Sequence, residues 1–203
     1  IWTWTDTMKT LSMIFVCTVI SIVIGLPTGI AMARSNRLQN LVSPVLDVMQ
    51  TLPSFVYLIP VVMLLGIGKV AGLIAVVVYA LPPMIRLTNL GIRHVDAEML
   101  ECADAFGSSG WQKLKNVQLP LALPSIMAGI NQTIMVALAM VVIASMIGVQ
   151  GLGQPVLKAI SNQYFTLGMF NGLAIVGIAV IFDRVSQAYG RRLQKHLEMV
   201  HGH

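Results

Sequence analysis

The residues most able to do chemistry in this chain lie in the polar stretch 98–120, because most of the remaining sequence is apolar. Apolar side chains recur there at i, i+3, i+4 and i+7, the spacing of one helical face, at Met99, Cys102, Ala103 and Phe106. Three carboxylates fall away from that face, at Glu98, Glu101 and Asp104. A short amphipathic helix of this kind is suited to docking, and two surfaces stay open as its target: a soluble partner and the bilayer.

A sharp corner is predicted directly after this helix. Gly107 suits a C-terminal helix cap, where the residue takes a positive φ at low cost. Ser109 and Gln112 then form the S-x-x-Q pattern of a capping box, which starts the next helix. We therefore expect the stretch 96–120 to be a loop that contains two helices meeting at a corner.

No arrangement of residues typical of catalysis appears in the sequence. It has no G-x-x-x-x-G-K-[ST] motif to hold phosphate and no G-x-S-x-G nucleophile motif. Its four histidines are loop or tail residues without metal-ligand spacing. We expect no catalytic residue, no metal site and no cofactor in this chain, so an ATP-driven process would require a separate ATP-binding subunit.

Composition indicates a membrane protein with a single transmembrane domain over residues 1–203. Of these 203 residues, 56% are hydrophobic and 10% charged, whereas soluble domains have about 25% charged residues. Mean hydropathy is +0.80. The net charge of +5 comes from basic residues scattered among loops, so nucleic-acid binding is not expected.

Five apolar runs predict an all-α polytopic fold with five transmembrane helices, at residues 10–33, 48–68, 70–90, 126–147 and 167–182. Ser43 and Pro44 are predicted to start the second span as N-cap and first helical residue. Pro53 and Pro60 should break its backbone hydrogen bonds at membrane depth. Arg86 is expected to reach the interface from the end of the third span. The segment 148–153 is predicted to be a flexible external loop.

Basic residues predict the orientation. Ten Lys and Arg residues fall in loops on one side, and the remaining three of the 13, Lys9, Lys69 and Lys158, fall on the other. By the positive-inside rule, the loop 96–120 and the C-terminus are cytoplasmic. The amphipathic helix then lies where a cytoplasmic ATPase could bind it.

The loop also resembles the signature of the membrane subunits of binding-protein-dependent ABC importers. The resemblance rests on the pattern E-A-A, three residues, G, nine residues, I-x-L-P, with Cys102 in place of the second Ala and Val117 in place of Ile. It implies that the first helix is a coupling helix seated in a groove of the ATPase. The coupling residues are then Glu101, Ala103, Asp104, Phe106, Gly107, Leu119 and Pro120.

Further segments are similar to the permeases of glycine betaine and proline betaine importers, at residues 50–60, 80–88, 127–133, 141–147, 151–154 and 182–184. The resemblance implies a type I ABC importer permease core in the inner membrane of a bacterium. It also implies a permease homodimer, two ATP-binding subunits that bind ATP and Mg, and an extracytoplasmic substrate-binding protein. The expected cargo is glycine betaine or a related quaternary ammonium or methylated compatible solute, and choline, carnitine, trimethylamine oxide and amino acids stay open.

Candidate residues for the translocation path are Phe55, Tyr57, Asn131, Gln132 and Ser145. Aromatic faces attract a cation weakly, by about 0.5–2 kcal/mol each, which suits passage. Packing between helices is the alternative role for Phe55 and Tyr57, and hydrogen bonding to a neighbouring helix is the alternative for the amides. No acidic residue is expected in the middle of a span. A stand-alone carrier or channel is the competing class of function, but neither an internal repeat nor intramembrane charge is visible.

Overall fold

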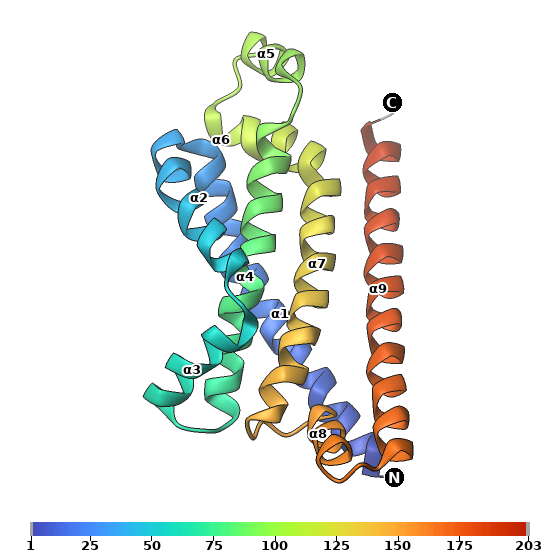
Figure 1. The fold of residues 1–203 in the computed structure, drawn as a ribbon. Coiled ribbons are helices and arrows are strands. Elements are labelled where there is room, and N and C mark those ends of the chain that lie inside the picture. The colour runs from blue at the N-terminus through green and yellow to red at the C-terminus, as the bar shows by residue number, and fades with distance from the viewer. Residues whose placement is uncertain (1, 202–203) are drawn as a thin grey trace.

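Helices are the only regular secondary structure in residues 2–201, the part of the chain that the computed structural model describes. Within this range Figure 1 shows one bundle built from consecutive helices. In chain order these are α1 (Trp2–Arg34), α2 (Asn36–Thr51), α3 (Ser54–Leu65), α4 (Lys69–Arg93), α5 (Ala97–Ala105), α6 (Gly110–Lys113), the π-helix η1 (Leu114–Gln118), α7 (Leu119–Met146), α8 (Gly153–Ser161) and α9 (Phe165–His201).

The membrane-spanning elements agree with the expected fold class. In the described residues, four stretches are long and apolar enough to cross a bilayer: Trp4–Arg34, Lys69–Arg93, Gly110–Met146 and Phe165–His196. The pair formed by α2 and α3 passes the same test together but is bent by 98° at its break. Counting that bent pair as one span gives the five that the sequence predicts.

The predicted start of the second span is wrong. Ser35, not Ser43, caps the helix, and its Oγ accepts a hydrogen bond from the Leu38 N–H at 3.4 Å. Pro44 consequently lies inside α2. The break comes at Pro53, where the preceding Leu52 is extended (φ −71°, ψ 134°), the conformation that a following proline favours.

The hydrophobic core lies where α4 packs between α1 and α7. Small side chains allow the close approach of α1 to α4, since a Cβ atom at Gly25 would lie 2.8 Å from Met84 and one at Gly29 would lie 2.6 Å from Thr88. Gly25 and Gly29 form the small-xxx-small spacing typical of packed transmembrane helices. Ala75, fully buried in the core, shows how tightly α4 is enclosed.

The two ends of the bundle carry different elements (Figure 1). Helices α5 and α6 and the C-terminal end of α9 lie at one end, and the N-terminus, α8 and the start of α4 lie at the other. The three basic residues that the sequence assigns to the external side, Lys9, Lys69 and Lys158, belong to α1, α4 and α8 and lie at that second end. The bundle therefore preserves the charge asymmetry on which the predicted orientation depends.

The segment between α7 and α8 was predicted to be flexible, and the structure instead packs it into the bundle. Val149 and Leu152 are buried. The Leu152 N–H donates a hydrogen bond to the buried Thr10 Oγ1 of α1 at 3.0 Å. The two apolar side chains explain the difference. Burying them lowers the free energy by more than the conformational entropy that a mobile loop would retain.

Candidate functional site: the α5 surface and the polar residues of the spans

Helix α5 projects from the end of the bundle and packs against α6 and η1 (Figure 1). Of the apolar face predicted from its sequence, only Ala103 is buried. Met99 is 48% exposed and Phe106 is 85% exposed. Most of this face is therefore free to meet a molecule outside the chain.

Gly107 forms the corner that follows α5, as predicted. Its φ is +73°, in the region that favours glycine. The Gly107 N–H donates to the Asp104 carbonyl at 2.9 Å, and the Ser108 N–H donates to the Ala103 carbonyl at 3.1 Å. These two bonds are those of a Schellman motif, which ends the helix.

The capping box is also confirmed. The Ser109 side chain accepts from the Gln112 N–H at 3.3 Å, and the Ser109 N–H donates to Gln112 Oε1 at 2.9 Å. Helix α6 therefore begins within three residues of Gly107. The corner and the cap hold α5 at a set angle to the helix that follows.

Acidic residues are concentrated on and beside α5, away from its exposed apolar face. Four of the eight acidic residues of the chain lie in this short stretch, and all four are exposed: Asp96, Glu98, Glu101 and Asp104. Asp104 pairs with Lys113 of α6. In the described part of the chain no ion pair forms at the other three, so their carboxylates remain available to a basic partner surface.

The corner connects α5 to the membrane core through one long helical stretch. Helices α6, η1 and α7 follow each other without a gap from Gly110 to Met146. Leu114, almost fully buried, packs with Leu119 in a cluster that includes Met84 of α4. Pro120 lies in the first turn of α7, directly after the π-helix η1. A displacement of α5 would therefore be transmitted to α7 along this continuous, partly buried helical stretch.

The aromatic residues predicted for the path have different surroundings. Phe55, the second residue of α3, is 51% exposed. The Tyr57 hydroxyl donates a hydrogen bond to the Met49 carbonyl of α2. Its ring lies edge-on to that of Tyr79, with the centroids 5.2 Å apart. Tyr57 thus ties α3 to α2 and α4, while Phe55 remains free.

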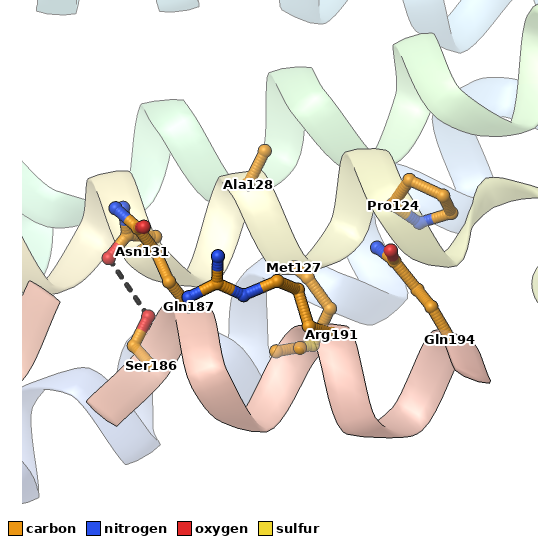
Figure 2. Close-up of a pocket in the computed structure, with 9 residues that line it drawn as sticks. Pro124, Met127, Ala128, Asn131, Ser186, Gln187, Arg191 and Gln194 are labelled. Carbon is orange, nitrogen blue, oxygen red and sulfur yellow. Dashed lines mark hydrogen bonds between the residues drawn. The ribbon is translucent and has the colours of Figure 1, made fainter. Parts of the chain in front are cut away.

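Asn131 joins α7 to α9 (Figure 2). Its Nδ2 donates to Asp183 Oδ1 at 3.1 Å, and its Oδ1 accepts from the Ser186 hydroxyl at 2.8 Å. Gln187 also donates to Asp183 at 2.8 Å. Together with Arg191, the side chains of Asn131, Ser186 and Gln187 line a cavity of about 270 Å³ between the two helices.

The fifth apolar span was predicted to end at Phe182, and helix α9 does not end there. Helix α9 continues to His201, and Asp183 lies well inside it. A hydrogen-bonded carboxylate is tolerated there because Asn131 and Gln187 both donate to it.

The five path candidates do not form one site within the chain. Gln132 is exposed, on a different side of α7 from the buried Thr133. Ser145 is buried, and its hydroxyl donates to the Val142 carbonyl of its own helix at 2.6 Å. Phe55 lies on α3, apart from the contacts between α7 and α9. Their role in a path stays a prediction.

Comparison with known proteins supplies the family. The profile described as "Binding-protein-dependent transport system inner membrane component" matches residues 21–195. The chain belongs to this family. The inner membrane components of binding-protein-dependent transport systems are permeases rather than enzymes. The ABC importer signature, which runs from α5 to the start of α7, agrees with that membership.

Two relatives show how far the similarity extends. The chain is 52% identical over 189 residues to the glycine betaine/carnitine transport permease protein GbuB of Listeria monocytogenes, covering 93% of this chain and 67% of GbuB. It is 53% identical over 188 residues to the glycine betaine/proline betaine transport system permease protein ProW of Escherichia coli, covering 93% of this chain and 53% of ProW. The chain thus spans between about half and two thirds of the length of these relatives.

Solved structures place this inner membrane component among the type I ABC importer permeases by fold. A chain of the MetNI methionine ABC transporter in an inward-facing conformation superimposes with a TM-score of 0.81 at 22% identity. The match covers 97% of each chain. Because the identity is low, this likeness concerns the fold, including the projecting α5, and carries no information on cargo.

Sequence reasoning missed two polar clusters that hold the helices of this permease together. Arg86, expected only to reach the interface, pairs with Asp47 of α2. Arg93 donates to Asn36 at 2.8 Å, to Asn89 at 3.0 Å and to the Met32 carbonyl at 2.8 Å. Of these contacts, only the i, i+4 spacing of Asn89 and Arg93 on α4 could have been found from sequence.

Proposed function

We propose that this chain is the transmembrane permease subunit of an ATP-driven importer for glycine betaine or a related quaternary ammonium or methylated compatible solute. The observation that carries the proposal is the exposed α5 surface, whose half-exposed Met99, highly exposed Phe106 and unpaired carboxylates stand clear of the bundle. Exposed apolar side chains that gather on one face of a projecting helix favour a bound partner. Membership of the inner membrane component family supports an ATPase as that partner.

The proposed coupling surface comprises the residues that the sequence pattern selects: Glu101, Ala103, Asp104, Phe106, Gly107, Leu119 and Pro120. Phe106 would enter an apolar groove, and Glu101 would meet basic side chains. Leu119 and Pro120 lie at the start of α7, where movement of α5 enters the membrane core. Two ATP-binding subunits would hold ATP and Mg, so this chain would need no nucleotide site.

The proposed assembly is a homodimer of the permease with an extracytoplasmic substrate-binding protein. Helix α9 leaves an apolar face exposed in the single chain, which includes Phe170, Leu173 and Val176. A second copy and lipid would share that surface. The coupling loop and the C-terminus would face the cytoplasm, because the end of the bundle that carries them holds most of the basic residues.

The cargo assignment rests on the two relatives, whose names specify glycine betaine transport. Phe55 gives it a physical counterpart in this chain, since its half-exposed ring could attract a quaternary ammonium group. Tyr57, whose hydroxyl and ring are held by α2 and α4, would shape the path rather than contact cargo directly.

Uptake by the reconstituted transporter tests the proposal. Proteoliposomes that contain the permease, its ATPase and its binding protein should accumulate labelled glycine betaine only when ATP and the binding protein are both present. Proline betaine, carnitine, choline and trimethylamine oxide should be tried as competitors. Uptake of an unrelated amino acid without any betaine transport would reject the cargo.

Ion dependence separates this function from that of a secondary carrier. Uptake driven by a proton or sodium gradient without ATP would reject the ATP-driven class altogether. In that case Asp183, the hydrogen-bonded carboxylate inside α9, would be the first residue to examine.

A further inference from the structure

A second cavity lies at the opposite end of the bundle from α5, and the function proposed above does not use it. It measures about 420 Å³ and lies between the N-terminal part of α1, the start of α4 and the segment that follows α7. Met8, Met13, Val16 and Leu73 give it mostly apolar walls, and Lys9 and Lys69 also line it. The cavity therefore combines mostly apolar walls with two lysine ammonium groups.

These two lysines account for most of the positive charge at this end. Lys9, Lys69 and Lys158 are the basic residues that the sequence assigns to this side, and only Lys158 lies away from the cavity. Lys9 is 3.9 Å from Asp6, with 40% of its own side chain exposed, so this pair is weak. No described carboxylate pairs with Lys69. The two lysines and Asp6 leave a net positive charge beside the cavity.

Below the lysines, the cavity continues onto an exposed apolar face of α1. Met8, Val16, Val19 and Val23 are each at least 39% exposed. At 100° per residue these four positions fall within one quarter of the helix circumference. They form a stripe that runs from the cavity toward the middle of the span. A long apolar chain could follow this stripe without leaving the hydrocarbon region.

We propose that this cavity binds one anionic phospholipid from the leaflet at this end of the bundle. The phosphate lies between the Lys9 and Lys69 ammonium groups, and one acyl chain lies over Met13 and Val16 and continues along α1. An amphipathic occupant suits the site better than an acidic protein loop, because a protein carboxylate would satisfy the lysines but leave the apolar walls uncovered. Lysine stems that line apolar surface below a charged head fit the same arrangement.

Lipid retention by the assembled transporter tests this inference. The transporter is purified in mild detergent from membranes that contain phosphatidylglycerol, and native mass spectrometry counts the lipids on the intact complex. Lys9→Gln and Lys69→Gln should each lower phosphatidylglycerol affinity by about five-fold, the effect of one basic residue at an anionic surface. Val16→Trp should lower retention without changing any charge.

Lys158→Gln is the matched control, because it removes the third lysine of this end outside the cavity. Its phosphatidylglycerol affinity should remain that of the unaltered protein. Because only intact complexes are counted, a variant that fails to assemble does not enter the comparison. Glycerol phosphate, which has the charge but no acyl chain, should not displace the lipid.

Three results would overturn the inference. Equal loss of lipid in Lys158→Gln and in the cavity variants would mean that the effect is general charge. Displacement by glycerol phosphate would mean an anion site rather than a lipid site. Loss of binding-protein affinity in Lys9→Gln and Lys69→Gln, with phosphatidylglycerol retention unchanged, would assign the surface to protein docking. The readout is bound lipid, so it is independent of which solute the permease carries.

Discussion

Asp104 of α5 and Lys113 of α6 form an ion pair across the corner at Gly107. Lys113 is the more enclosed partner, with 22% of its side chain exposed against 58% for Asp104. The pair links the projecting helix to the stretch that continues into α7. It therefore helps to set the angle at which α5 would meet a partner.

Neutralising each charge, and then exchanging the two, tests this role. Asp104→Asn and Lys113→Gln should each weaken substrate-stimulated ATP hydrolysis by the assembled transporter, because α5 is then less firmly oriented. The free energy of unfolding should change by no more than about 1 kcal/mol, since the pair is partly exposed. The double variant Asp104→Lys, Lys113→Asp should recover part of the activity. A double variant no better than the single ones would show that the pairing itself is unimportant.

Gly107 supplies a sharper test of the corner. Gly107→Val places a β-branched residue at φ +73°, at a cost of roughly 1–2 kcal/mol or more. No heavy atom lies within 4 Å of a Cβ atom added there, so the cost comes from the backbone alone. We expect normal membrane insertion with reduced ATP hydrolysis and uptake.

Gly110→Ala is the control for that variant. Gly110 lies in the same loop, has no positive φ, and an added Cβ would meet only ordinary contact with Arg34 at 3.6 Å. Activity should be close to that of the unaltered protein. Full substrate-stimulated hydrolysis in Gly107→Val, and in Glu101→Lys at the acidic surface, would contradict the coupling role of α5.

Local patterns explain which parts of the fold could be predicted. The cap at Gly107 and the box formed by Ser109 and Gln112 depend on neighbouring residues only, so the sequence contains all the information needed. Composition alone likewise predicts the long apolar spans. The small-xxx-small pair Gly25 and Gly29 is also local, and the pattern could have been found in the first apolar run.

Contacts between distant residues explain what could not be predicted. Asn131 and Asp183 are 52 positions apart, and Asp47 and Arg86 are 39 apart. Their pairing depends on which helices the bundle places side by side. The start of α2 is a different failure, because the predicted cap at Ser43 is a local pattern too, yet Ser35 forms the N-cap.

Cysteine labelling tests the predicted orientation. In a Cys102→Ala background, which removes the exposed native thiol and leaves the buried Cys17, a cysteine at Lys158 should react with an impermeant reagent added from outside. A cysteine at Arg191 should react only after the membrane is opened. The reverse pattern would place α5 and the C-terminus outside the cytoplasm.

The close contact between α1 and α4 predicts a stability effect at Gly29. A Cβ atom there would lie 2.6 Å from Thr88 Cβ and 2.8 Å from the Ile85 carbonyl oxygen. Gly29→Leu should lower the free energy of unfolding by about 1–3 kcal/mol or more, as overpacking does. Thermal unfolding of the purified protein measures this change.

Gly172→Leu is the matched control for Gly29→Leu. It introduces the same side chain into another spanning helix, where no heavy atom lies within 4 Å of an added Cβ. Its thermal unfolding should be close to that of the unaltered protein. Because leucine favours the helix more than glycine does, an equal loss of stability in both variants would point to a general effect of the added side chain rather than to the contact between α1 and α4.

Variants of Asn131 and of its neighbour Gln132 distinguish a structural role from a role in the translocation path. Asn131→Ala removes the amide that donates a hydrogen bond to Asp183 and accepts one from the Ser186 hydroxyl. The free energy of unfolding should fall by about 0.6–1.7 kcal/mol, the range for hydrogen bonds between transmembrane helices. Gln132→Ala, at an exposed position, should leave stability unchanged.

Thermal unfolding and the KM for glycine betaine uptake are then compared between the two variants. We expect the KM to be unchanged in Asn131→Ala, because its side chain is occupied by α9. A changed KM without loss of stability in Asn131→Ala would contradict this, and the same result in Gln132→Ala would support its place in the path.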